Sequence, residues 1–463
     1  MGARANRAPG PRFLTPLGFI AAVRENPLEV LANWWKQYGD FVEIRFGPWS
    51  SFLVVHPADV RHILHENHKN YWKGLLLEKL KRIAGEGLVF SDGDLWRQQR
   101  RLAQPAFHRD RIAALAGMMT DATEATLEAW TTRSAEVINV SAEASKLTLQ
   151  IVGRALFGTT LGEDEQRFST AVTGGLVYAN HLINRFMPLP IWVPTRANRA
   201  ARVAIATMDE IVHKIIDRRR RAGDGAAANG DLLGMLIEAR DEETSATMND
   251  RQLRDEVITF LVAGHETTAV TLSWTWHLLS GDAQVEARLF AEVDEVLGGR
   301  TPVLGDLDNL VYTKKVVQEA MRLYPPAWAL SRQAYETDEL REHRVVPNAV
   351  VTISPYLTHR HPEYWPDPER FNPERFSPKA SAGRPEYAYF PFGGGPRRCI
   401  GNQFAMMEAA LILAMTAQRF RLVAAPGHPV EKDPILTLRP KPGVFMHLQR
   451  RTGNGAAHTA PSA

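Results

Sequence analysis

The chain has 463 residues, of which 44% are hydrophobic and 23% are charged, as in an ordinary globular protein. A formal net charge of +3 is too small to favour nucleic acid as a partner, and a single cysteine excludes an internal disulfide or a multi-cysteine metal site. Near the N-terminus, no apolar run reaches the roughly 18 residues of a membrane span, and no convincing secretion signal is found. We expect a cytoplasmic, monomeric protein without a membrane span.

The first predicted element is a flexible, proline-interrupted lead-in at residues 1–20. Residues 41–57, FVEIRFGPWSSFLVVHP, alternate around a turn at Gly47-Pro48, which predicts two strands. The next predicted region, from Asp59 to Leu323, is mainly helical, with helices at 111–131 and 201–222 and a solvent loop at 218–231. After it we expect short extended pieces beyond Pro325 and coil from Pro362 to Pro391. The chain is predicted to end with a helix from about Gln403 and a disordered tail at 451–463. This pattern predicts one large domain, residues 21–450, mainly α with a small β lobe.

The strongest helical pattern covers residues 249–279, which would span about 45 Å and cross the whole domain. Its middle should be apolar, yet it reads GHETT at 264–268. One interpretation is a polar kink whose threonines bond back to the previous turn. The other is a local opening of the helix against a cofactor, where an acid and an alcohol carry protons. A zinc-protease motif is excluded, because no histidine stands four residues after His265.

Two further motifs are each ambiguous alone. In QEAMRLYPP, residues 318–326, Glu319 and Arg322 have the i, i+3 spacing of a helical ion pair, which is common and weak on a surface. In DGDLWRQQRRLAQPAFH, residues 92–108, Trp96 and Arg100 share one helix face. That face is either part of an amphipathic basic helix or a site that holds an anion.

The only cysteine, Cys399, lies in PFGGGPRRCIGNQFA, residues 391–405. A lone cysteine is most often a small buried hydrophobe. Here, however, the loop resembles the cysteine loop of the cytochrome P-450 haem-thiolate monooxygenases, Phe-x-x-Gly-x-Arg-x-Cys-x-Gly. The matching residues are Phe392, Gly395, Arg397, Cys399 and Gly401.

Four other segments resemble the same family in the same order along the chain. They are WRQQR at 96–100, AGHETT at 263–268, EAMR at 319–322 and FNPERF at 371–376, which supplies Arg375. The resemblance covers about residues 15–450. It implies the P-450 fold, a single large domain with a long central helix over haem.

The resemblance also implies the cofactor and its ligands. Cys399, as thiolate, would ligate the iron of haem b and favour O–O cleavage, and Gly393 to Gly395 would let the backbone lie close to the porphyrin. The residues expected to hold the haem propionates are Arg397, Arg100, Trp96 and Arg332. The other cofactor-binding residues implied are Phe392, Gly393, Gly401 and Ala263.

Thr267 would hydrogen-bond the dioxygen and Glu266 would link it to a solvent proton path, while Glu319, Arg322 and Arg375 would form a structural network.

Electrons would come from NAD(P)H through a separate ferredoxin or flavodoxin and its reductase. The expected docking surface is basic and consists of Arg97, Arg101 and Arg398.

The reaction expected is the insertion of one oxygen atom into an apolar small molecule such as a fatty acid or terpenoid, beneath a mobile lid at residues 174–193. A haem-thiolate isomerase or peroxygenase and a haem sensor are the alternatives. Neither needs a proton relay for dioxygen, so the presence of both Glu266 and Thr267 favours the monooxygenase.

Overall fold

The computed structural model describes residues 7–451 except 25, 48, 134, 159–160, 184, 186–187, 222–230, 239 and 241–246. The predicted tail from 452 onward, Pro48 of the predicted turn, most of the loop at 218–231 and three positions of the predicted lid therefore lie outside the described residues. Among the described helices, none is long and apolar enough to cross a membrane.

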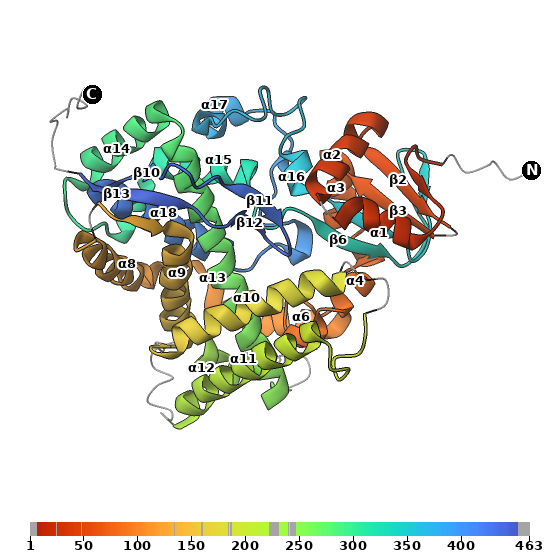
Figure 1. Cartoon of the computed structure of the whole chain (residues 1–463), viewed down its shortest axis with the longest axis horizontal. Coiled ribbons are helices and arrows are strands. Elements are labelled where there is room, and N and C mark those ends of the chain that lie inside the picture. The colour runs from red at the N-terminus through yellow and green to blue at the C-terminus, as the bar shows by residue number, and fades with distance from the viewer. Residues whose placement is uncertain are drawn as a thin grey trace, which may run out of the picture.

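Helices make up the larger part of the molecule, and a β lobe lies at one end of it (Figure 1). The helices are α1 (Pro16–Arg24), α2 (Pro27–Tyr38), α3 (Pro57–Arg61), α4 (Gly74–Glu78), α5 (Lys81–Ala84), α6 (Gly93–Ala103), α7 (Arg109–Ala114), α8 (Ala116–Thr131), α9 (Val140–Phe157), α10 (Asp164–Ile183), α11 (Arg196–Arg221), α12 (Leu232–Glu238), α13 (Asp250–Ser280), α14 (Ala283–Leu297), α15 (Val311–Leu323), α16 (Pro355–Thr358), α17 (Pro378–Ser381) and α18 (Asn402–Arg419).

The β lobe is a mixed six-stranded sheet with the order β1-β2-β3-β9-β6-β4. Its strands are β1 (Arg12–Phe13), β2 (Phe41–Phe46), β3 (Trp49–Val54), β4 (Tyr71–Trp72), β6 (Leu330–Ala334) and β9 (Val350–Ile353). The smaller sheets contain β5 (Val137–Asn139), β10 (Phe420–Ala424) and β13 (Phe445–Arg450), then β11 (Glu431–Pro434) with β12 (Leu438–Lys441), and β7 (Asp338–Leu340) with β8 (His343–Val345). The predicted class, mainly α with a small β lobe, is confirmed.

From residue 7 onward the N-terminal segment differs from the flexible lead-in that the sequence predicts for residues 1–20, and residues 1–6 lie outside the described residues. Arg12 and Phe13 pair in parallel with β2, and α1 follows from Pro16. The Phe19 ring stacks on Phe46 at 5.3 Å between centroids. Aromatic contacts thus hold this segment against the sheet, an effect that its prolines do not reveal.

Helix α13 crosses the middle of the helical part (Figure 1), as predicted. Its N-terminus has a capping box in which Asn249 and Gln252 satisfy each other's backbone N–H groups. α9 packs against it at Gly264, where an added Cβ would lie 3.0 Å from Val152 Cγ2. The glycine therefore allows two helices to approach beside the polar segment.

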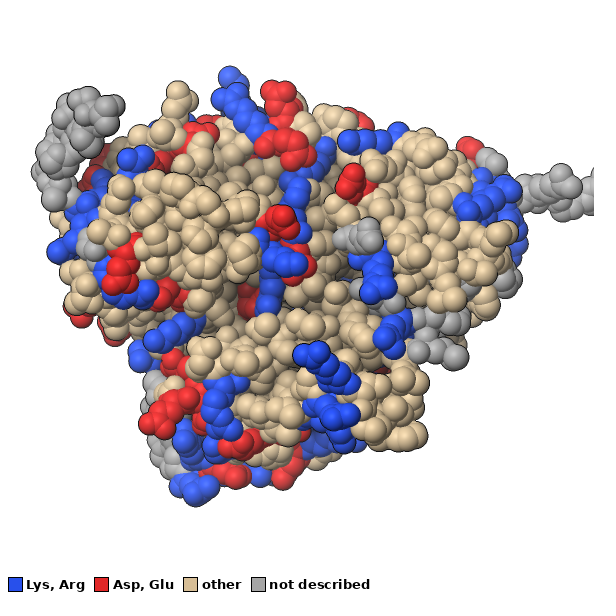
Figure 2. Space-filling model, in the orientation of Figure 1, with Lys and Arg blue, Asp and Glu red and all other residues tan. Residues whose placement is uncertain are grey.

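The surface carries charges of both signs. Acidic and basic side chains are interspersed over the face shown in Figure 2, in keeping with the net charge of +3. Electrostatic attraction of a partner by this surface therefore depends on local clusters of cations and not on the net charge.

Candidate active site

The cysteine loop is a tight turn that precedes α18. Cys399 N–H donates to Phe392 O at 2.9 Å, and Arg398 N–H donates to Gly395 O at 3.1 Å. These bonds hold the cysteine backbone in place, and Gly401 leads into the helix.

The three glycines of this loop differ in how much space a side chain would have at each position. Gly395 has φ +62°, and an added Cβ would lie 1.8 Å from Leu64 O, so no other residue fits there. A Cβ on Gly394 would lie 2.3 Å from the Tyr387 ring. At Gly393 the nearest side-chain atom would be 4.0 Å away. Only Gly393 of the three thus borders open space, whereas the resemblance implies that all three lie against the cofactor.

The Cys399 side chain is exposed although its loop packs inside the fold. Burial raises the pKa of the thiol, while the Gly401 N–H and the charges of Arg100 and Arg398 act to lower it. The sulfur is therefore accessible to a bound group although many protein atoms surround it, which is what a ligand of a bound cofactor requires.

Part of α13 borders open space as well. Val262, Ala263, Gly264 and Thr267 are half-buried, whereas most residues on either side of them are buried. The Phe107 ring connects this helix to the cysteine loop, since it lies 5.6 Å from the Phe260 ring and 3.6 Å from the position of a Cβ on Gly401.

The local opening of α13 is not present in this structure. The helix is continuous, with Thr267 Oγ1 donating to Ala263 O at 2.8 Å and Thr268 Oγ1 donating to Gly264 O at 3.3 Å. These bonds to the previous turn match the first interpretation of the motif, and the prediction of an opened helix is wrong for this state.

Glu266 forms a buried ion pair that the sequence did not reveal. Arg439 Nε and Nη2 donate to its two oxygens at 2.5 and 2.6 Å, and Thr437 Oγ1 donates at 3.0 Å. Burial alone would raise the pKa of Glu266, but Arg439 lowers it below the usual value, so the group is a carboxylate. Arg439 and Thr437 come from β12 and the turn before it, and no sequence signal connects them to α13.

Three of the four predicted anion-binding residues lie together, and Arg100 does not join them. The Arg397 guanidinium lies 4.2 Å from the Trp96 ring centroid and forms an ion pair with Asp92. Burial, followed by the charge of Arg397, lowers the pKa of Arg332 to about 10. Arg100 donates instead to Arg398 O at 3.0 Å and so attaches α6 to the cysteine loop.

Lys73 also belongs to this cluster, although no sequence motif identified it. Its side chain is buried and donates to Leu88 O at 3.0 Å and to Val89 O. Burial and then the charge of Arg397 hold its pKa well below the usual value. Lys73, Arg332 and Arg397 thus lie near Asp92, and this group of basic side chains fits an anionic group such as a pair of propionates, whose charge would also favour the protonated form of Lys73.

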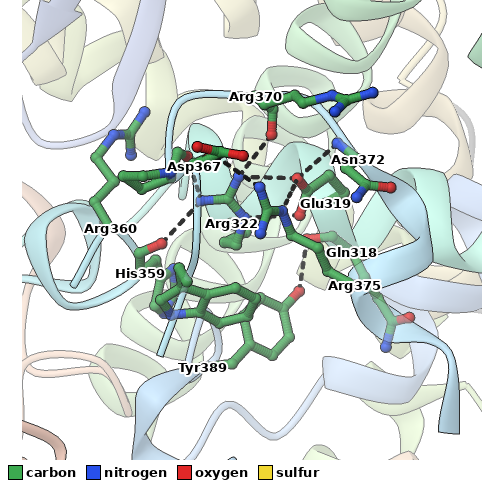
Figure 3. A network of polar contacts seen from close by, with 12 residues as sticks. Gln318, Glu319, Arg322, His359, Arg360, Asp367, Arg370, Asn372, Arg375 and Tyr389 are labelled. Carbon is green, nitrogen blue, oxygen red and sulfur yellow. Dashed lines mark hydrogen bonds and ion pairs between the residues drawn. The ribbon is translucent and has the colours of Figure 1, made fainter. Parts of the chain in front are cut away.

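Glu319 and Arg322 are fully buried and form a two-bond ion pair at 2.7 and 2.8 Å (Figure 3). Arg322 also donates to the carbonyl oxygens of His359, Pro368 and Arg370. Arg375 lies 3.4 Å from Glu319 and so joins the pair, as the resemblance implies.

The same network reaches the start of the cysteine loop. The neutral His359 ring accepts the Phe390 N–H at 2.9 Å, and Tyr389 OH donates to Gln318 O at 2.9 Å (Figure 3 shows His359 and Tyr389). The buried ion pair therefore positions the backbone just before Phe392.

Comparison with known proteins agrees with this site. The family described as Cytochrome P450 matches residues 8–447. The chain is 40% identical over 437 residues to cyclooctatin synthase of Streptomyces melanosporofaciens, covering 93% of each chain. It is 38% identical over 422 residues to cyclooctat-9-en-7-ol 5-monooxygenase of the same organism, covering 90% of each, and 32% identical over 455 residues to pentalenene oxygenase of Streptomyces avermitilis, covering 97% of this chain and 98% of the other.

The chain belongs to the cytochrome P450 family and is a haem-thiolate monooxygenase. Its residues fit the family's haem, because an accessible thiol and a group of basic side chains around Asp92 occur together.

Proposed function

We propose that this monooxygenase inserts one oxygen atom into a terpenoid, by hydroxylation or epoxidation. The observation that carries the proposal is the accessible Cys399 thiol together with the half-buried residues Val262, Ala263, Gly264 and Thr267 on α13. Three relatives that match nearly the whole chain have names that refer to terpenoid chemistry.

Haem b bound here would supply the oxidising chemistry, with Cys399 as its thiolate ligand. Arg397, Arg332 and Lys73 would hold its carboxylates, with Trp96 beneath the Arg397 guanidinium. The Thr267 hydroxyl would orient dioxygen, and Glu266 would connect it to solvent through Arg439, which is partly exposed. Phe392, Gly393, Gly401 and Ala263 would contact the cofactor.

Electrons are proposed to come from NAD(P)H through a separate ferredoxin or flavodoxin. Arg97, Arg101 and Arg398 are exposed, and the bond from Arg100 to Arg398 O places α6 next to the cysteine loop. A basic surface on this side would increase the association rate of an acidic donor. We further propose that the protein is a cytoplasmic monomer.

The substrate class is tested by adding a cyclic diterpene alcohol, a sesquiterpene hydrocarbon, a fatty acid and a sterol to the haem-loaded chain. We expect the terpenoids to produce the larger haem spin-state shift and to bind at least about tenfold more tightly, a difference of about 1.4 kcal/mol. Tighter binding of the fatty acid, with oxygenation of it, would contradict the terpenoid assignment.

Replacing Thr267 with alanine should lower product formation at least about tenfold and raise the peroxide released per NAD(P)H, since a positioned proton donor contributes about 10²–10⁴-fold. Thr267→Ser keeps the hydroxyl and is the matched control. Equal coupling of NAD(P)H to product in the alanine and serine variants would disprove the role of the hydroxyl.

A further inference from the structure

A helical turn of the rare π type lies against the cysteine loop. Helix α3 continues into the segment His62–Glu66, where Asn67 N–H donates to His62 O at 2.8 Å, a bond that spans five residues instead of four. Turns of this kind are uncommon and are frequently found at functional sites. The proposed function gives this π-turn no role.

The backbone of the π-turn touches Gly395 of the cysteine loop. An added Cβ on Gly395 would lie 1.8 Å from Leu64 O. Gly395 N–H donates to the Tyr387 hydroxyl oxygen at 3.1 Å, and Gly395 O accepts from Arg398 N–H. Leu64 and Tyr387 are buried in the same hydrophobic cluster. A shift of the π-turn would therefore displace the loop four residues before Cys399.

Asp338 on β7 holds both ends of the π-turn. Its Oδ2 lies 2.8 Å from His62 Nε2 and accepts from Asn67 Nδ2 at 3.1 Å. The same oxygen accepts from Tyr71 OH at 2.7 Å, and Oδ1 accepts from Glu339 N–H at 2.9 Å. Because His62 is the first residue of the π-turn and Asn67 follows its last, one carboxyl group ties the turn at its start and at its end.

The Asp338 carboxyl group is ionised. Burial alone would raise its pKa, but hydrogen bonds from Tyr71 and His62 lower the pKa below its usual value. A carboxylate only accepts hydrogen bonds, so His62 Nε2 carries the hydrogen of this contact. Several side chains thus donate to one charge, and such bonds are about twice as strong as those between neutral groups.

We propose that Asp338 and His62 are positioning residues for the iron ligand: they fix the π-turn, and the Leu64 carbonyl of that turn sets the position of Gly395 and with it the Cys399 sulfur. Without these contacts the turn can rewind as an α-helix or unravel, and either change moves Leu64 O relative to Gly395. This assignment rests on the proposed role of Cys399 as the ligand.

The π-turn acts at a different place from the buried pair of Glu319 and Arg322. The network of that pair reaches the chain at Phe390, before the loop begins. The π-turn reaches it at Gly395, inside the loop. Loss of the first should lower haem content, whereas loss of the second should leave haem bound with an altered ligand position.

Hydrogen exchange of the haem-loaded full chain tests the positioning role without substrate or turnover. His62→Leu and Asp338→Ala should each speed exchange of the Gly395, Arg398 and Cys399 amides by at least about tenfold, the effect of losing a hydrogen bond to a charged group. His62→Gln keeps a donor close to the position of Nε2 and should restore wild-type exchange. Equal acceleration throughout α13 would show that the two residues only stabilise the fold, and would overturn the proposal.

The iron–sulfur stretching frequency of the same protein, measured by resonance Raman spectroscopy, tests whether the sulfur moves. The frequency should shift in His62→Leu and Asp338→Ala and return in His62→Gln. Asp40→Ala is the matched control, because Asp40 also lies 3.1 Å from a histidine nitrogen, His361 Nε2, and accepts from Trp35 Nε1 at 2.9 Å, but is in the turn between α2 and β2.

An unchanged frequency in His62→Leu, or an equal shift in Asp40→Ala, would overturn the proposal. If Asp338→Ala does not fold, leucine and glutamine at position 62 provide the same comparison, since 29% of the His62 side chain is exposed. A wrong terpenoid assignment would affect neither measurement, and a wrong ligand assignment would remove the iron–sulfur band from the unaltered protein, so each failure is distinguishable.

Discussion

Replacing Cys399 with serine is expected to abolish the red-shifted Soret band of the reduced carbon monoxide complex and to lower product formation more than about a hundredfold. The band requires thiolate donation to haem iron, which a serine oxygen does not supply. Changes to the outer partners of a metal ligand already cost about 10–100-fold, so loss of the ligand should cost more. The measurement is the reduced carbon monoxide difference spectrum, with haem content determined separately.

Ile400→Val is a suitable control, because it alters the adjacent residue and leaves the thiol. The serine variant changes one atom, so Gly395 can retain its contact with Leu64 O and the loop should keep its shape. A serine variant with full haem content and an unchanged band would show that Cys399 is not the ligand.

The cysteine loop could be predicted from sequence because its geometry depends on residues close together in the chain. Gly395 must be glycine for a local reason, a positive φ and the approach of a carbonyl oxygen, and such requirements leave a fixed spacing. The bounds of α13 were predictable for the same reason, since Asn249 caps it and Gly281 follows it.

The partners of the buried charges could not be predicted. Glu266 meets Arg439, and Arg397 meets Asp92, through tertiary packing, and a charged residue has no spacing that identifies a partner far along the chain. Glu408 is a further case, because only the fold shows that this carboxyl group of α18 is fully buried and has no hydrogen-bond partner among the described residues. Sequence therefore identifies anomalous residues more readily than their partners.

Two predictions were limited because they used only residues that lie close together in the chain. The prolines near the N-terminus favoured a flexible lead-in, but the Phe19–Phe46 contact is long-range. The GHETT segment allowed either a bonded or an opened helix, and hydroxyl bonds from Thr267 and Thr268 to the preceding turn give the closed form here. Whether the helix opens therefore depends on what holds these two hydroxyl groups.

Replacing Glu319 with alanine is expected to leave little haem-loaded protein and to lower Tm. The variant leaves the Arg322 guanidinium buried without its carboxylate, a change that costs about 3–5 kcal/mol. That is a large share of the roughly 5–15 kcal/mol by which a folded protein is stable. Because the Arg322 network extends through His359 to Phe390, the cysteine loop should lose its position first. Haem content per chain and thermal unfolding measure the effect.

Glu78→Ala is the matched control, since Glu78 and Lys81 have the same i, i+3 spacing and a distance of 2.6 Å, but the Glu78 side chain is 50% exposed. Its loss should cost less than about 1 kcal/mol and leave haem content unchanged. Normal haem loading in Glu319→Ala would refute the structural role of the network. A large difference between the two variants would show that burial, which the spacing of the motif does not reveal, determines the contribution of this pair.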